Sequence, residues 1–323
     1  MPDGKHIAKD TGAEGATLAH VAMLYYREGL TQGEIARRTG VSRATIVNWL
    51  RLAREQAIVD IRIRGESFAA SPLARRLAGR FGLIDAYIAH DDAEPLTADA
   101  MLTRTALLGA QAMHDLLSED DRLGVAWGET VRRMAEAFPT ADLPGLVVHQ
   151  LVGSMYSEHL FAAETCTIEI ARRLRARCRT LHAPAILSSG KLADALRQEP
   201  VIQDQLDDFR SMTKALFSVG DVSDRTTLVA AGIGSASDVA WYRERGAAAV
   251  LSCHFIDHDG NAMHGPLTDR TIGIAPDVLR EVPMRMLVVA GDEKRAATLA
   301  LLKGGYITHL VVDEGNAKAL LDA

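Results

Sequence analysis

The sequence predicts an α/β protein with two unequal domains, a small helical one at the N-terminus and a larger layered one after it. The length of 323 residues exceeds that of one typical domain. Between residues 17 and 55, apolar side chains recur at helical spacing. From residue 83 onward, short apolar runs alternate with helical patterns, which is typical of a mostly parallel sheet covered by helices.

The composition excludes several classes of protein. Hydrophobic residues make up 48% of the chain and charged residues 24%, so it is not disordered, collagen-like or fibrous. No apolar run approaches the ~20 residues of a membrane helix, and the first twenty residues lack the apolar core of a signal peptide. We therefore expect a cytoplasmic protein with no membrane partner. The widely spaced cysteines are expected to be reduced thiols: Cys166, Cys178 and Cys253.

Charge is distributed unevenly along the chain. The formal net charge is -6, which alone argues against binding nucleic acid. Residues 31–64, however, hold seven arginines and three acidic residues, so that this segment carries +4 and the remainder carries -10. A small basic segment attached to an acidic body is typical of DNA-binding regulators, because attraction to phosphate is local.

The basic segment contains the pattern of a helix-turn-helix. An amphipathic helix is expected over residues 17–28, followed by a capping box in which Thr31 begins a second helix and Glu34 lies three residues on. Gly40 supplies a tight turn, and Ser42 is a natural N-cap for a third helix whose apolar stripe includes Ile46. Residues 58–63 alternate in polarity and are predicted to form a short strand that ends the module.

The polar residues at the start of the third helix are predicted to read DNA. Arginine binds guanine bidentately and asparagine does the same to adenine, while hydroxyl groups contact bases or phosphates. Gln32, at the start of the preceding helix, is placed to contact a phosphate. The predicted DNA-binding residues are Thr31, Gln32, Ser42, Arg43, Thr45 and Asn48.

Three segments follow from this pattern. Residues 1–64 are predicted to form the helix-turn-helix domain with a disordered N-terminal tail, and residues 65–82 a linker with a coupling helix near 73–81. Residues 83–323 are predicted to form the α/β domain for effector binding and oligomerisation. Its strands are expected within the apolar runs, including 179–186, 226–232 and 247–257.

Glycine and polar residues follow several of these runs, at the sheet edge where ligands bind in parallel sheets. Such segments leave backbone amides free to hold an anion. Lys294 and Arg270 are cations able to reach a phosphate, and Asp221 and Asp257 could accept hydroxyl groups of a polyol. The sequence therefore predicts a small-molecule pocket from 127–130, Gly153–Ser154, Gly220–Ser223, Asp257–Gly260 and Gly291–Lys294.

Seven stretches carry a resemblance over nearly the whole chain: LTQGEIARRTGVSRATI (30–46), RLGVAWGETV (122–131), VVHQLVGS (147–154), HAPAI (182–186), FIDHDGNAMHGPLTDRTIGI (255–274), MLVVAGDEKRAATLALLKGG (286–305) and VVDEGNAKALL (311–321). On these stretches the chain resembles the SorC-type (DeoR/SorC-like) transcriptional regulators. The resemblance implies a Rossmann-like α/β sugar-binding domain, related to the glucosamine-phosphate deaminase and ribose-phosphate isomerase fold.

The resemblance also implies partners and site residues. Members of the family control operons for carbohydrate or polyol catabolism, often as repressors, and bind double-stranded operator DNA as homodimers or homotetramers. The effector is a sugar, sugar phosphate or polyol, which would change how the body domains pair. No catalytic residue, metal or cofactor is implied. The positions carried over to the effector are Trp127, Gly128, Thr130, Gly153, Ser154, Arg179, Asp257, Arg270 and Lys294.

The chain departs from the family pattern at three places. Glu129 stands where arginine is frequent, Val250 replaces an acidic residue, and Gly220–Val222 replaces a Gly-Ile-Gly. Fewer cations and an added carboxylate favour a neutral sugar or polyol over a phosphorylated one. The arginine run from 172 to 179 is interpreted as a solvated helix end, with Arg179 alone directed at the pocket.

The residues also offer candidates for two other functions. An isomerase or deaminase of the same fold would need a general base, for which Asp257, His258 and Lys294 are candidates, but an enzyme has no need of the N-terminal module. A metal-dependent sensor would use Cys253 and neighbouring histidines. We expect no metal there, because Cys253 and His254 are adjacent on a predicted strand and point to opposite faces.

Overall fold

The structure is a computed structural model that describes residues 11–56, 58–59, 66–92, 94, 96–155, 163–223 and 226–323. The residues outside this description include the predicted tail at 1–10, residues 60–63 of the predicted strand 58–63, and residues 161–162. The chain divides into two compact units, Met1–Ile63 and Arg64–Ala323. Each unit is described by itself.

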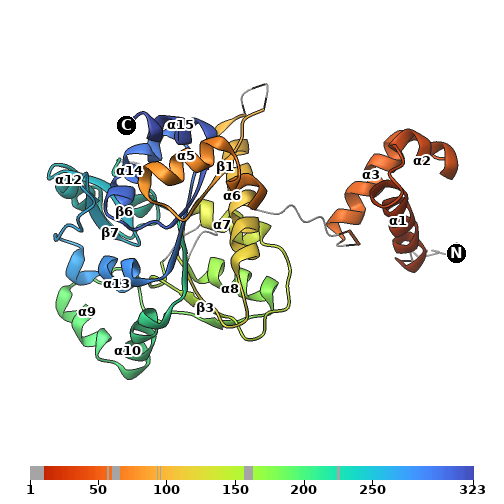
Figure 1. Ribbon diagram of the computed structural model, residues 1–323. Coiled ribbons are helices and arrows are strands. Elements are labelled where there is room, and N and C mark those ends of the chain that lie inside the picture. Colours follow the sequence, from red (N-terminus) through yellow and green to blue (C-terminus); the bar gives the residue numbers. More distant parts are fainter. Residues whose placement is uncertain are drawn as a thin grey trace, which may run out of the picture. The chain divides into compact units, whose positions relative to one another are not determined.

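The first unit contains three helices, α1 (Thr11–Tyr26), α2 (Gln32–Thr39) and α3 (Arg43–Glu55) (Figure 1). The helix expected over 17–28 begins six residues earlier and ends two residues sooner. One apolar cluster holds the unit together, because each helix contributes buried side chains to it. These are Leu18, Val21, Ala22, Leu24, Ile35, Ala36, Ile46, Leu50 and Ala53.

The second unit is built on a seven-stranded sheet with the order β1-β9-β8-β5-β2-β3-β4. Every strand pair in this sheet is parallel, which confirms the predicted fold class. The strands are β1 (Asp85–Ala89), β2 (Arg122–Val125), β3 (Val147–Gln150), β4 (Arg177–Arg179), β5 (Lys214–Phe217), β8 (Met284–Val289) and β9 (His309–Asp313).

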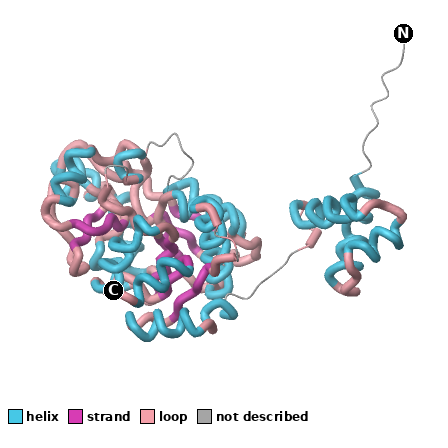
Figure 2. The backbone as a smooth tube through the Cα atoms, turned by 90° about the horizontal axis from the view of Figure 1, so that it is seen from above, coloured by secondary structure: helices cyan, strands magenta, loops and turns pink. Residues whose placement is uncertain are grey.

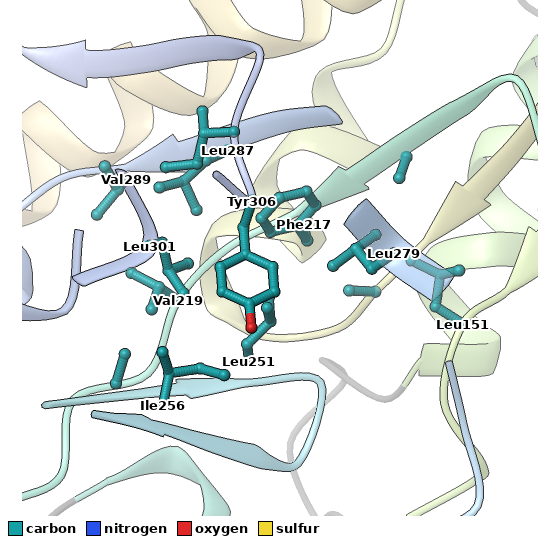
Figure 3. Close-up of a cluster of buried hydrophobic side chains, with 14 of the residues drawn as sticks. Leu151, Phe217, Val219, Leu251, Ile256, Leu279, Leu287, Val289, Leu301 and Tyr306 are labelled. Atoms are coloured by element: carbon teal, nitrogen blue, oxygen red, sulfur yellow. The ribbon is translucent and has the colours of Figure 1, made fainter. Parts of the chain in front are cut away.

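Helices cover both faces of this sheet (Figure 2). Alternate side chains along a strand point to opposite faces, so that Leu216 packs under α6 (Ala98–Leu116), α7 (Glu129–Ala137) and α8 (Ala163–Leu174). Its neighbour Phe217 lies in the core of the other face, around Tyr306 (Figure 3). The helices contributing to that core are α5 (Pro72–Phe81), α9 (Gly190–Arg197), α10 (Pro200–Asp207), α13 (Pro276–Glu281), α14 (Arg295–Lys303) and α15 (Glu314–Leu321).

The segment predicted as a linker contains two helices, α4 (Glu66–Ala69) and α5. Ser71 caps α5 by accepting the N–H of Ala74, and Gly82 ends it with a φ of 66°. Ala74 and Leu77 are buried in the core of the second unit. The coupling helix is therefore packed on the α/β unit rather than free of it.

Three of the predicted strands are wrong in detail. The run 247–257 is a hairpin of β6 (Ala247–Leu251) and β7 (His254–Asp257), which form a separate antiparallel sheet. The run 226–232 contains the short helix α11 (Thr227–Ala230), since the Thr226 carbonyl accepts the N–H groups of Val229 and Ala230. Of the run 179–186, only Arg179 lies in a strand, while Pro184 and Ile186 form isolated bridges to Ser154 and Thr271.

The arginine run 172–179 also differs from its interpretation as one helix end. Arg172 and Arg173 lie in the last turn of α8, and Arg175 turns the chain with a φ of 50°. Arg177 and Arg179 belong to β4, at the edge of the sheet. The sequence patterns do not predict α9, α10, α13 or α12 (Ala236–Arg243), nor the 3-10 turns η1 (Asp208–Ser211), η2 (Thr268–Arg270) and η3 (Asp292–Lys294).

Candidate functional site

The helix-turn-helix is fixed by the local bonds that its sequence predicts. Thr31 accepts the N–H of Glu34, whose carboxylate accepts the N–H of Thr31 at 2.8 Å, which completes a capping box. Gly40 ends α2 with a φ of 72°. Ser42 then caps α3 by accepting the N–H of Thr45 at 3.0 Å. The hydroxyl groups of Thr31 and Ser42 thus accept capping bonds, and the Thr45 hydroxyl group is bonded to that of Ser42 at 2.8 Å.

The remaining predicted DNA-binding residues lie on the surface of this unit. Arg43 is exposed, and its Nε donates to Gln32 Oε1 at 3.4 Å, which joins the starts of α2 and α3. Asn48 is also exposed and accepts a bond from Arg51 at 2.8 Å. Arg43 and Gln32 therefore lie together at the starts of α3 and α2, and Asn48 pairs with Arg51 further along α3.

Val47 is a surface residue that sequence analysis missed. Its side chain is 47% exposed, although it is apolar and lies on α3. It is four residues from both Arg43 and Arg51, so the three side chains lie on one helix face. In helices that read DNA, an exposed apolar side chain can contact the methyl group of thymine. In the sequence, the sign that Val47 is exposed is its position outside the apolar stripe of α3.

In the second unit, a cavity of ≈ 200 Å³ lies where three neighbouring strands end. Segments that follow β2, β5 and β8 line it, together with α11 and the β6–β7 hairpin. This is the carboxyl edge at which sequence analysis placed a pocket. The lining residues are Leu102, Ala126, Trp127, Gly128, Glu129, Thr130, Ser218, Val219, Gly220, Thr226, Thr227, Leu228, Val250, Ser252, Cys253, Ala290, Glu293 and Lys294.

The N-terminus of α7 forms one wall of the cavity. Gly128 precedes the helix with a φ of 118°, a conformation that only glycine adopts readily, and no side chain caps this end. The first N–H groups of a helix have no partner within it, so they face the cavity as hydrogen-bond donors. Thr130, in the first turn, is buried at the same wall.

Lys294 places a positive charge at the cavity, and Asp221 balances it. Lys294 Nζ lies 3.4 Å from Asp221 Oδ2, and both side chains are about one-fifth exposed, at 18% and 19%. Burial raises the pKa of Asp221, but bonds from Ser223 and the charge of Lys294 outweigh it and hold that pKa below its usual value. Asp221 is thus ionised, and its charge offsets that of Lys294.

Glu129 contributes less charge to the cavity than the sequence indicates. Its carboxylate accepts bonds from Arg132 at 2.7 Å and from Arg133 at 2.7 Å. These bonds, together with the arginine charges, hold the pKa of Glu129 below its usual range, despite partial burial. The added carboxylate is therefore neutralised within α7, and it does not by itself favour a neutral ligand.

Trp127 and Cys253 lie at the cavity beside each other. The Trp127 side chain donates a hydrogen bond to the Cys253 sulfur. Burial raises the pKa of the Cys253 thiol to about 12, so the thiol is neutral and unreactive as a nucleophile. Cys253 lies in the hairpin turn, with a φ of 69°, and not on a strand as predicted. Cys253 and His254 are therefore not adjacent on one strand, contrary to the prediction.

Six predicted effector residues lie outside the residues that line this cavity, among them Asp221, which is paired with the lining residue Lys294. Gly153 and Ser154 follow β3 and pair with the 183–184 segment; a Cβ at Gly153 would lie 2.5 Å from the Ala183 oxygen. Arg270 donates to the Leu187 carbonyl at 2.6 Å, and Asp257 accepts the N–H of Asn261 at 2.8 Å. Arg179 pairs with Asp208.

Sequence analysis missed Thr226 and Ser252, both of which line the cavity. Each lies in a segment predicted as one continuous strand, and that prediction does not place either side chain at the pocket. Ser252 is a polar residue between two apolar runs, and this break in the pattern is the sequence signal for a turn.

Neither a metal site nor a membrane helix is found in the part of the chain that the structure describes. Within it, no group of three or more histidine, cysteine, aspartate or glutamate side chains is arranged to hold a metal ion. No described helix is long and apolar enough to cross a membrane.

Comparison with known proteins agrees with this architecture. The family described as "Putative sugar-binding domain" matches residues 66–322. A transcriptional regulator of Escherichia coli K12, YjhU, is 34% identical over 94% of this chain and 93% of its own. The deoxyribonucleoside regulator of Bacillus subtilis is 28% identical over 93% of this chain and 96% of its own.

The full-length sorbitol operon regulator SorC of Klebsiella pneumoniae has the same fold. Its crystal structure superposes with a TM-score of 0.77 at 27% identity and covers 95% of this chain and 98% of that one. A helix-turn-helix joined to a sugar-binding domain of this fold defines the class of protein, a transcriptional regulator. The chain belongs to the SorC family, as its sequence resemblance indicates.

Proposed function

We propose that this chain binds operator DNA through α2 and α3 and that a small sugar-type effector in the 200 Å³ cavity controls this binding. The observation that carries the proposal is the cavity itself. It lies at the carboxyl ends of the neighbouring strands β2, β5 and β8, and its wall includes an uncapped helix N-terminus and Lys294. The effector residues we assign are Trp127, Gly128, Thr130, Asp221 and Lys294.

The regulated genes are, in this proposal, an operon for carbohydrate or polyol catabolism. The relatives named for sorbitol and deoxyribonucleosides support that class of effector. We further propose that the protein acts in the cytoplasm as a homodimer or homotetramer, so that two reading heads contact a repeated operator. The effector must bind one arrangement of subunits more tightly than another to change DNA affinity. Light scattering of the purified protein tests the oligomeric state.

A catalytic function receives less support from the geometry. Asp257 and His258, the candidate base and its partner, lie outside the cavity lining. The Asp257 carboxylate accepts N–H groups of Asp259 and Asn261, at 2.9 and 2.8 Å, and so stabilises its own turn. Turnover of a sugar phosphate that Asp257→Asn abolishes would establish an enzyme instead.

The Arg43→Ala variant tests the DNA surface. Loss of one bidentate contact to guanine is expected to lower operator affinity by about tenfold or more, at 1–3 kcal/mol per contact. Electrophoretic mobility shift with an operator selected from a random library measures the change. Lys191→Ala, an exposed residue of α9 that also loses one positive charge, is the control. Equal affinity of Arg43→Ala and Lys191→Ala would exclude Arg43 as a reader.

The Lys294→Gln variant tests the effector site. A thermal-shift screen of the wild type against sugars, polyols and their phosphates first identifies a ligand, because only a bound ligand raises the midpoint. Lys294→Gln is then expected to weaken that ligand by about tenfold, as loss of a charged hydrogen bond does. Lys303→Gln, at the far end of α14, is the control. An unchanged affinity in Lys294→Gln would place the effector elsewhere.

A further inference from the structure

The exposed face of α3 contains a short apolar strip among charged and polar residues. Ala44 and Val47 form this strip, and they lie three residues apart, so that their side chains are neighbours on the helix surface. Val47 is the larger of the two and is 47% exposed. The exposed residues of α3 are Arg43, Ala44, Val47, Asn48, Arg51, Arg54 and Glu55.

The fold of the first unit does not account for a valine at position 47. The core of the unit takes Ile46, Leu50 and Ala53 from α3, and Val47 is neither buried in that cluster nor packed against it. A β-branched side chain also has a lower helix propensity than alanine, since the helix restricts its rotation. Neither packing nor helix formation therefore favours valine over alanine at this site.

The polar side chains next to Val47 have hydrogen-bond partners. Arg51 donates to Asn48 Oδ1 at 2.8 Å and to the Glu55 carboxylate at 2.5 and 2.6 Å. Arg43, one turn before Val47, donates to Gln32 at 3.4 Å. These bonds hold the polar groups along the helix, while the stiff valine side chain stays exposed between Arg43 and Arg51.

The chemistry of the major groove offers one apolar group to such a strip. The base edges present donors and acceptors there, and thymine adds the methyl group on its C5 atom. Phosphates are bound by cations, N–H groups and polar side chains, so an apolar strip does not suit them. Four residues of helix rise by about 6 Å, which corresponds to about two base steps of 3.4 Å.

We propose that Ala44 and Val47 form a specificity contact for the 5-methyl group of a thymine in the operator. This thymine lies within about two base steps of the guanine that Arg43 is predicted to bind. The inference rests on the proposed function of α3 in binding DNA, and it adds the identity of a second base that the helix recognises.

Replacement of thymine by uracil in the operator tests the proposal, because it removes only the methyl group. An operator is first selected from a random library with the full-length wild type, and its thymines are then replaced one position at a time. At one position of the half-site, the wild type is expected to lose about fourfold in affinity by fluorescence anisotropy, as loss of one buried methyl group does.

The Val47→Ala variant assigns that loss to its residue. It is expected to bind the thymine and uracil forms of this position equally, and to bind the thymine form about fourfold more weakly than the wild type does. Its thermal midpoint without DNA is expected to equal or exceed that of the wild type, because alanine has the higher helix propensity. A weaker affinity would then not result from unfolding.

Val201→Ala is the matched control, since Val201 is an exposed valine of α10 in the second unit. This variant is expected to distinguish thymine from uracil as the wild type does. The inference is wrong if Val47→Ala retains that distinction, if the wild type shows it at no position, or if Val47→Ala weakens both forms equally; binding to the operator would still support the proposed function. If selection with the wild type enriches no sequence, both are overturned.

Discussion

His149 is a buried histidine whose charge state the surrounding residues control. It is 2% exposed on β3, and Arg179 lies opposite it on the neighbouring strand β4. Burial lowers the pKa of His149 from 6.5 to about 4, and repulsion from Arg122, Arg179 and Arg177 adds to this effect. The imidazole is therefore neutral in the folded protein at pH 7, which avoids a further positive charge beside the arginines.

This shift predicts a loss of stability in mild acid. The unfolded chain takes up a proton on His149 near pH 6.5, whereas the folded chain does so only near pH 4. Between these values the unfolded state binds more protons, so the free energy of unfolding falls as the pH falls through this window. The difference amounts to about 3 kcal/mol at about 1.4 kcal/mol per pKa unit.

Urea unfolding of the wild type and of His149→Gln at pH 7 and pH 4.5 measures the effect. The wild type is expected to lose about 2–3 kcal/mol more than the variant between these pH values. The exposed His182→Gln serves as control and should follow the wild type. Parallel pH dependence of the wild type and His149→Gln would mean that His149 is protonated in the folded state.

At the scale of secondary structure elements, the start of α7 depends on Gly128. A Cβ there would meet no atom within 4 Å, so the φ of 118° is the sole obstacle to a side chain. Gly128→Ala is expected to lower the free energy of unfolding by about 1–3 kcal/mol and to weaken effector binding. Gly79→Ala, at an exposed site within α5, should instead stabilise by about 0.5–1 kcal/mol. Chemical denaturation compares them, and equal changes would contradict the backbone argument.

Elements with strong local signals could be predicted from the sequence. The capping box at Thr31, the turn at Gly40 and the cap at Ser42 lie where the pattern indicates, because each depends on bonds within four residues. The hairpin at 247–257 could not, because its apolar run continues across a turn made by Ser252 and Cys253. Non-glycine residues in that turn give no local warning of a positive φ.

The residues of the candidate cavity also divide into those that the sequence predicts and those that it does not. Trp127, Gly128, Thr130 and Lys294 follow strands of a parallel sheet, and so the general rule for such sheets placed them together. Thr226 and Ser252 reach the cavity through segments outside that sheet, whose positions depend on tertiary packing. Sequence spacing carries no information about such contacts, which is why both residues were missed.

At the scale of the whole molecule, the charge distribution separates two tasks. The segment 31–64 carries +4 and the rest of the chain carries -10, and the two compact units, which divide after Ile63, carry +2 and -8. Attraction to DNA is therefore concentrated in the first unit, and the acidic second unit lowers nonspecific association with nucleic acid. The net charge of -6 conceals this arrangement, because it sums two units of opposite sign.

This separation predicts that salt affects the two binding activities differently. Neutralisation of phosphates releases counterions, so operator affinity should fall on the order of a hundredfold between 50 and 200 mM KCl for every four phosphates contacted. The proposed effector cavity has one lining cation, Lys294, which is already paired with Asp221, so effector affinity is expected to change little with salt. Fluorescence anisotropy with labelled operator and calorimetry with the effector identified in the thermal screen measure the two affinities. Operator affinity that is independent of salt would contradict a reading head that binds through its arginines.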